Sequence, residues 1–214
     1  MALAAFKETL TDGEESPMGS IQQVTWRIPV VVDEPVKVNI AITPTTNTSR
    51  YEFQISQFHS SSERSVPACV KGSLTTDVLN RPFIDLDQLL SQHAQQLHQG
   101  RVLYDIFEQG NIYYGQSHRC ISEFYTLPSS DSVLAKLTLE EQLAEQLNTY
   151  AMHPGMLDAA IQASVALALP TIGNMRSEEV KLALPYSGER ITVDEKCQKQ
   201  MCAYIRNNKN TGSV

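Results

Sequence analysis

The residues best suited to chemistry stand in one short stretch, 150–163, with the sequence YAMHPGMLDAAIQA. Asp158 and Gln162 are four residues apart, so a helix would bring the carboxyl and the amide to the same side. The stretch that follows, 159–169, is the most apolar of the chain. A carboxyl group beside it would be partly desolvated, which raises its pKa and suits it to act as a general acid. An Asp in an early helical turn is also favoured by the helix dipole alone, so the spacing leaves both interpretations open.

A helix over 154–167 would have to hold these two side chains. Pro154 fits a first helical turn because its missing N–H is not needed there. Apolar residues then recur at helical spacing, at Met156, Leu157, Ala160 and Ile161. The pattern predicts a helix that starts near Pro154 and packs an apolar stripe against the rest of the fold.

The first part of the chain predicts a short helix followed by strands. Leu3, Phe6 and Leu10 share one face of a helix over 1–10. The pattern then changes to a period of two, which predicts four strands near 24–32, 36–43, 51–55 and 66–74, with Val30 to Val32 as a buried run. We expect these strands to form an antiparallel meander.

The second part repeats the order of helices and strands. A polar amphipathic helix is predicted over 85–97, with Asp85 as N-cap and Gly100 as its stop, lying on the surface as a link. A helix over 101–108 follows. Further strands are predicted at 121–125, 133–137, 179–183, 191–193 and 200–205. The expected organisation is an α+β protein with an N-terminal half over 1–80, a linker over 81–100 and a C-terminal half over 101–214.

Composition excludes several classes of function. The chain has 214 residues, of which 42% are hydrophobic and 19% charged, with a net charge of −7. No dense Lys/Arg cluster occurs, so nucleic acid is not an expected partner. The longest apolar stretch is too short to span a bilayer and the start lacks the basic region of a signal peptide, so we expect a cytoplasmic protein without membrane contact. The four cysteines form no C-x-x-C pair, and we expect reduced thiols and no metal site.

Three motifs carry a resemblance to a known family. His153-Pro154-x-x-Leu157-Asp158-Ala159-Ala160-x-Gln162 resembles the H-P-x-x-L-D-A-x-x-Q motif of the dehydratase domains of modular polyketide synthases. The segment 110–118 is similar to their G-x-x-Y-G-P-x-F/H motif, in the form with His found in synthases that use a separate acyltransferase. Leu184-Pro185-Tyr186-Ser187 is similar to their L-P-F-S or L-P-Y-S. Gln116 stands where the family usually has Pro, and one extra residue separates Gly110 from Tyr114.

This resemblance implies a double hotdog fold, in which two antiparallel sheets each wrap a central helix, here 1–10 and 154–167. It implies elimination of water from a 3-hydroxyacyl thioester, carried on the phosphopantetheine of an acyl carrier protein, to give an enoyl thioester. It implies no directly bound cofactor. The implied partners are the carrier protein and other domains of the same megasynthase, and a homodimer is a possible assembly.

The resemblance also assigns the site. Asp158 is the implied general acid and Gln162 orients it, while His153 and Pro154 are expected to set the start of the helix. The implied substrate-binding residues are Tyr114, Gly115, His118, His153, Pro154, Leu157, Pro185 and Tyr186.

One element of the family pattern is missing. The family's catalytic His lies in an H-x-x-x-G-x-x-x-x-P motif before the first helix, and this chain has no His before His59. We therefore expect a dehydratase that is truncated at both ends and inactive over this span without the upstream His. The other explanation for the missing His is a native, degenerate homologue that never had it. The alternative is a non-catalytic hotdog scaffold that docks carrier protein or self-associates. A relative that shifts double bonds is disfavoured, because such domains tend to lack the Asp.

Overall fold

The computed structural model describes residues 1–7, 19–46, 49–58, 67–75, 83–93, 97–126, 132–168, 182, 184–193 and 195–207. The chain forms two compact units. One comprises Met1–Arg81 with Leu184–Glu195, and the other comprises Pro82–Ala183 with Lys196–Val214. Each unit has an antiparallel sheet and its own apolar core.

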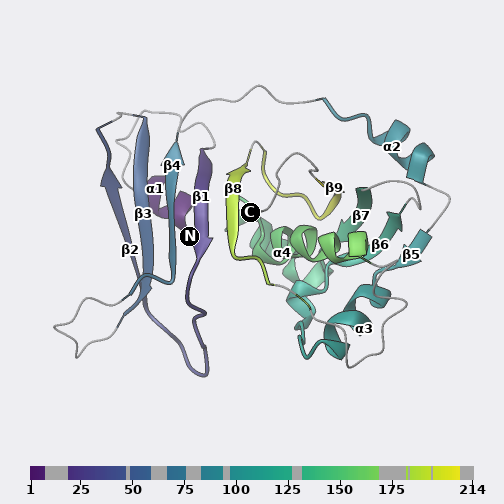
Figure 1. Cartoon of the computed structure of the whole chain (residues 1–214), viewed down its shortest axis with the longest axis horizontal. Helices are drawn as coiled ribbons and strands as arrows, with labels where there is room; N and C mark the ends of the chain where they lie inside the picture. Colours follow the sequence, from purple (N-terminus) through teal and green to yellow (C-terminus); the bar gives the residue numbers. More distant parts are fainter. Residues whose placement is uncertain are drawn as a thin grey trace. The chain divides into compact units, whose positions relative to one another are not determined.

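The first unit places the short helix α1 (Ala2–Lys7) against a sheet with the strand order β2-β3-β4-β1-β8 (Figure 1). The strands are β1 (Ser20–Trp26), β2 (Val38–Pro44), β3 (Arg50–Gln57), β4 (Val70–Thr75) and β8 (Ser187–Thr192). Phe6 of α1 packs with Phe53 and Leu74 in the core of this unit. Its ring centroid lies 4.8 Å from that of Tyr51.

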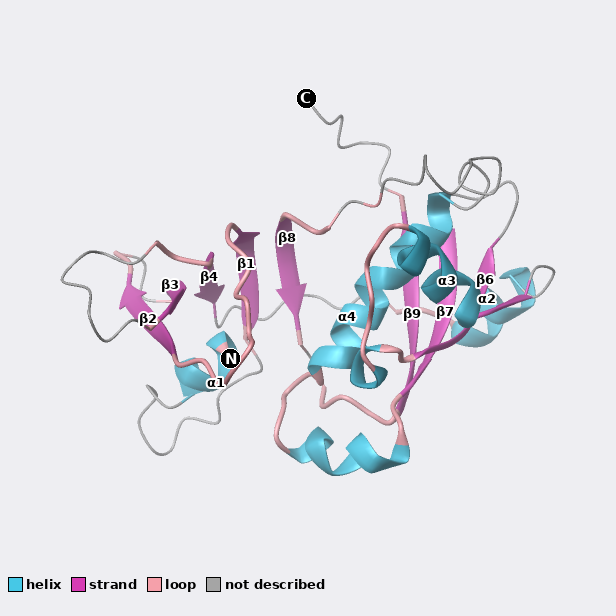
Figure 2. Ribbon diagram, turned by 90° about the horizontal axis from the view of Figure 1, so that it is seen from below, coloured by secondary structure: helices cyan, strands magenta, loops and turns pink. Residues whose placement is uncertain are grey.

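The second unit has the strand order β5-β6-β7-β9, with α4 lying against β7 and β9 (Figure 2). Its strands are β5 (Leu97–Gln99), β6 (Ile121–Thr126), β7 (Ser132–Thr138) and β9 (Gln200–Arg206). Its helices are α2 (Leu86–His93), α3 (Arg101–Gln109) and α4 (Pro154–Gln162), with short 3-10 helices η1 (Gln116–His118), η2 (Glu141–Asn148) and η3 (Ala163–Ala168). Leu103, Phe124, Val133 and Ala159 are among its fully buried core residues.

The two antiparallel sheets and their helices confirm the predicted architecture. α4 begins at Pro154 as predicted, and η3 continues it to Ala168. The Asp85 carboxylate accepts a hydrogen bond from the Gln88 N–H at 3.0 Å, which confirms the predicted cap of α2. Residues 8–10 of the first helix, and most of the predicted strand at 179–183, lie outside the described residues.

Two predictions in the first unit are wrong. Val31 and Val32 are not a buried run, since their exposed fractions are 66% and 65%. Pro29 and Pro35 bracket them, and residues without a backbone N–H interrupt the pairing of a strand. The strands also do not form a simple four-strand meander, because β1 pairs with β4 and not with β2. The 27–37 segment lets the chain cross from β1 to the far edge of the sheet.

Two other differences concern chain order. The predicted helix 85–97 ends at His93, and Leu97 instead opens β5. The strand β8 belongs by sequence to the C-terminal segment 101–214, yet its hydrogen bonds join it to β1 in the first sheet. Ile191 of β8 packs against the core of the first unit.

Candidate active site

His153 forms the start of α4. Its Nδ1 accepts a hydrogen bond from the Gly155 N–H at 3.2 Å, and Pro154 follows in the first turn. Since Nδ1 is the acceptor, the ring proton lies on Nε2, which is 3.3 Å from the Gln146 Oε1 of η2. Burial lowers the pKa of His153, with a smaller contribution from His118. The residue therefore acts as a neutral cap, with both ring nitrogens engaged.

Asp158 and Gln162 meet as the sequence predicted. The Gln162 Nε2 donates to the Asp158 Oδ2 at 2.8 Å and to the His118 carbonyl at 3.1 Å. Two acceptors on this nitrogen fix the orientation of the amide. Gln162 is only 3% exposed, and its Oε1 has no partner within the described part of the chain. One buried amide thus joins the half-buried carboxyl group to the loop that carries His118.

That loop leads from α3 into η1. The Tyr114 ring packs edge-on against Phe107, with centroids 5.0 Å apart, and more loosely against Tyr104 at 6.4 Å. Burial raises the pKa of Tyr114, and the negative charge of Asp158 raises it further, so the phenol and the carboxyl group lie in one electrostatic environment. The His118 Nδ1 is 3.0 Å from the Ser117 Oγ.

Two glycines define the space around this loop. A Cβ added to Gly155 would lie 2.0 Å from the Ser117 carbonyl oxygen, so only glycine lets α4 approach η1 this closely. A Cβ on Gly115 would meet no atom within 4 Å, and its φ of −71° is open to any residue. Gly155 is therefore required by the fold, whereas the fold does not explain Gly115.

The predicted site residues fall into two groups. Asp158, Gln162, Tyr114, Gly115 and His118 belong to the α4 and η1 region, with His153, Pro154 and Leu157 on the first turns of α4. Pro185 and Tyr186 belong to the other unit. There they line a largely apolar pocket of about 440 Å³ with the single tryptophan, Trp26, and with Ile28 and Pro29.

Cys120 and Arg119 were not singled out by the sequence, and Gln116 was noted only as a departure from the family motif. Cys120 is buried beside η1, and burial raises its pKa to about 11, with further contributions from Glu140, Cys197 and Asp158. Gln116 donates from Nε2 to the Glu140 Oε1 at 2.9 Å. Arg119 donates to the Tyr114 carbonyl and to Glu108. Cys120 and Arg119 belong to no motif, and the partners of Arg119 and Gln116 lie from 5 to 24 residues away in sequence.

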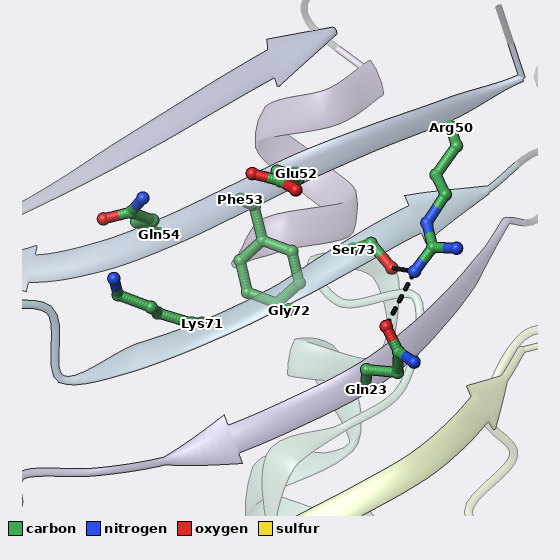
Figure 3. Close-up of a pocket in the computed structure, with 8 residues that line it drawn as sticks. All are labelled: Gln23, Arg50, Glu52, Phe53, Gln54, Lys71, Gly72 and Ser73. Carbon is green, nitrogen blue, oxygen red and sulfur yellow. Dashed lines mark hydrogen bonds between the residues drawn. The ribbon is translucent and has the colours of Figure 1, made fainter. Parts of the chain in front are cut away.

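A polar hollow of about 260 Å³ lies on the first sheet (Figure 3). Gln23 sits at an irregularity in β1 with a φ of 49°, a conformation uncommon for a residue with a side chain. The Arg50 Nη2 reaches across from β3 to the Gln23 Oε1 at 2.8 Å and the Ser73 Oγ at 3.0 Å. These bonds connect three neighbouring strands, β3, β1 and β4, and give Arg50, Gln23 and Ser73 a structural role.

Among the described residues, no three His, Cys, Asp or Glu side chains gather as metal ligands would. No helix in the same residues is long and apolar enough to cross a membrane.

Comparison with known families matches residues 84–213 to the polyketide synthase dehydratase N-terminal domain. Polyketide synthase PksN of Bacillus subtilis is 29% identical over 189 residues, which cover 87% of this chain and 3% of that protein. PksL of the same organism is 28% identical over 213 residues, covering 96% of this chain and 4% of that protein. The chain therefore corresponds to a small part of each of these relatives.

Solved structures show the same fold. A dehydratase domain of a trans-AT polyketide synthase from Brevibacillus brevis superposes with a TM-score of 0.83 at 22% identity, covering 100% of this chain and 72% of that one. An inactive His-to-Phe mutant of the CurK dehydratase gives 0.77 at 25% identity, with coverage of 98% and 70%. The two sheets and their helices are those of the double hotdog of these dehydratases.

Proposed function

The chain belongs to the polyketide synthase dehydratase family, and on this premise we propose that it serves to eliminate water from a 3-hydroxyacyl thioester held on an acyl carrier protein. The observation that carries the proposal is the pairing of the Asp158 carboxyl group with the buried Gln162 amide at 2.8 Å. The same amide binds the His118 carbonyl, so the carboxyl group is fixed relative to the loop of Tyr114 and Gly115. This is the arrangement that a positioned general acid needs.

In the proposed reaction, a base removes the α proton of the thioester. Asp158 gives its proton to the β-hydroxyl, the carbon–oxygen bond breaks, and water leaves as the double bond forms between the α and β carbons. Gln162 donates to Oδ2 and so leaves Oδ1 to hold the acidic proton. Tyr114, Gly115, His118 and Leu157 are the proposed contacts of the substrate near this carboxyl group.

We assign the role of base to none of the histidines that the structure describes. His153 has both ring nitrogens engaged in the cap of α4, and His98 is stacked on Phe124 at 4.9 Å with its Nε2 near Thr126. The CurK dehydratase is inactive when one of its histidines is replaced by phenylalanine. We propose that these 214 residues alone dehydrate slowly, because a missing base typically costs about 10² to 10⁴ in rate.

The partners follow from the family. We propose that the substrate arrives on the phosphopantetheine of a carrier protein, that other domains of the synthase act before and after this one, and that the chain works in the cytoplasm without a bound cofactor of its own. Self-association as a homodimer is a further proposal. Pro185 and Tyr186 are proposed to bind substrate through the pocket that they form with Trp26.

Replacement of Asp158 by Asn tests the function. Asn has the same shape and removes only the ionisable group, so turnover of a 3-hydroxyacyl carrier-protein thioester should fall by at least about 10². The assay uses the intact synthase polypeptide that carries this chain, so that every catalytic group is present. Gln162→Ala should give a smaller loss, since it removes the orienting amide and not the proton.

Asp105→Asn provides the matched control, because Asp105 is exposed on α3 and pairs with Arg101 of the same helix at 3.6 Å. It should leave turnover unchanged. Melting temperatures of all variants are measured in parallel, to separate lost chemistry from lost folding. Near-normal turnover by Asp158→Asn would contradict the proposal, because it would show that Asp158 is not the general acid.

A further inference from the structure

Arg119 connects the candidate site to α3. Its Nε donates to the Tyr114 carbonyl at 2.9 Å, and its Nη2 donates to the Glu108 Oε1 at 2.5 Å. Its guanidinium carbon also lies 5.3 Å from the centre of the Tyr104 ring. One side chain thus holds the loop backbone, a carboxylate and an aromatic face of α3 together.

Tyr114 rests on the same part of α3. Its ring contacts Phe107 and Tyr104, while its carbonyl is held by Arg119. The Tyr104 hydroxyl in turn accepts the Ile121 N–H at 3.0 Å, which ties the start of β6 to the helix. The loop is therefore fixed at both ends of its turn, before Gly115 and after His118.

The charge pair alone does not explain this arrangement. The Arg119 and Glu108 side chains are 40% and 41% exposed, and pairs this exposed contribute little to stability. The planar guanidinium, in contrast, offers two donors in a fixed geometry, one for the carboxylate and one for the carbonyl. A lysine could balance the charge of Glu108 but could not provide this fork.

We propose that Arg119 is a positioning residue that holds the Tyr114 loop against α3, acting through the Tyr114 carbonyl and Glu108, and that this loop is the one that Gln162 joins to Asp158 through the His118 carbonyl. The proposal rests on the proposed dehydratase function for its kinetic consequence, and on the geometry alone for its structural consequence. Loss of the two hydrogen bonds from Arg119 should let the loop and the Tyr114 ring shift, while α4 and Asp158 keep their positions.

The structural consequence is tested on the chain labelled with 3-fluorotyrosine, using fluorine NMR. Tyr114→Phe identifies the Tyr114 resonance. Arg119→Gln should shift or broaden that resonance, and Glu108→Gln should do so to a smaller extent. The control Arg101→Gln removes a comparable arginine of α3, 87% exposed and paired with Asp105, and should leave the resonance in place. An unchanged Tyr114 resonance in folded Arg119→Gln would overturn the proposal.

The kinetic consequence is tested in the intact synthase polypeptide. Arg119→Gln should lower kcat/KM for the carrier-bound substrate by at least about 10-fold, since small misplacements of a site lower rates strongly. Arg119→Lys should recover little of this loss, and the melting temperature should change little in both. Full rescue by Lys would show that only the positive charge matters. It would contradict the proposal that the two guanidinium donors of Arg119 hold the loop.

Together, the NMR and kinetic experiments distinguish a failure of the positioning role of Arg119 from a failure of the proposed dehydratase function. A shifted Tyr114 resonance in a polypeptide without dehydratase activity supports the positioning role and counts against the proposed function. A normal kcat/KM in an active Arg119→Gln enzyme overturns the positioning role and leaves the proposed function standing.

Discussion

At the residue scale, the cap of α4 links a protonation state to stability. His153 is 1% exposed and uses Nδ1 to accept the Gly155 N–H, so protonation of Nδ1 would remove the cap. Burial lowers the pKa of His153 below its ordinary value of 6.5. Below pH 6.5 the His153 ring takes up a proton in the unfolded chain, whereas in the folded chain it stays neutral until the pH nears its lowered pKa. The stabilisation is therefore fully present above about 6.5 and is lost as the pH falls toward the folded pKa.

We predict that the free energy of unfolding drops more between pH 7.5 and 5 in the wild-type chain than in His153→Asn. Asn can still accept the Gly155 N–H, because its side-chain oxygen serves well at an N-cap, but it does not titrate. Urea unfolding at several pH values measures both curves. An equal drop in the two proteins would contradict the role of His153 as the titrating cap.

The thiols offer a second prediction at this scale. Cys120 is buried with its pKa raised to about 11, whereas Cys202 is exposed on β9. The thiolate is the reactive form, so a pKa raised by about two units leaves roughly a hundredfold less of it at pH 8. In the folded chain, iodoacetamide should label Cys202 well before Cys120, as followed by peptide mass spectrometry. Early labelling of Cys120 would show that the region beside η1 opens to solvent.

At the element scale, the approach of α4 to η1 depends on one missing side chain. A Cβ on Gly155 would lie 2.0 Å from the Ser117 carbonyl oxygen, which belongs to the backbone and cannot rotate away. Gly155→Ala should therefore destabilise the protein by about 1–3 kcal/mol or more, although alanine is the better helix former. It should also weaken the bond from Gln162 to the His118 carbonyl and lower turnover.

Gly115→Ala is the matched control for this prediction. Its added methyl group meets no atom within 4 Å, and its φ of −71° is ordinary, so stability should stay within about 0.5 kcal/mol. Thermal and urea unfolding compare the two variants. Equal stability of both alanine variants would mean that α4 and η1 are not in close contact.

The elements also show how far sequence reasoning reaches. The start of α4, the bond between Asp158 and Gln162 and the Asp85 cap depend on neighbours within four residues, and all three could be predicted. Arg119 and Gln116 act through Tyr114, Glu108 and Glu140, and their partners could not be found by local periodicity. The 3-10 helix η2, which supplies Gln146 to His153, was missed for the same reason.

Strand pairing was the least predictable feature. The alternation of Val24 with Trp26 identified β1, but a local pattern does not say which strand lies beside it. β1 lies between β4 and β8, two strands far from it in sequence. The run of three valines at 30–32 is apolar enough for a core, and only the flanking prolines indicate otherwise.

At the scale of the whole molecule, the two units share the chain in an interleaved order. The first unit takes Met1–Arg81 and then regains Leu184–Glu195, which carries β8. β8 pairs with β1 from Ser187 to Thr192, and Ile191 packs with Ile21 and Trp26 against the same core. A segment that follows α4 in sequence thus completes the sheet of the other unit.

We predict that Ile191→Ala weakens the first unit and not the second. Truncation of a partly buried isoleucine should cost about 1–3 kcal/mol, less than the range typical of fully buried sites. Hydrogen exchange measured by NMR should then show reduced protection of the amides of β1 and β4, while those of β6 and β7 keep theirs. Glu189→Ala, an exposed change on the same strand, should leave both sets unchanged. Reduced protection confined to β6 and β7 would place β8 with the second unit and contradict its pairing with β1.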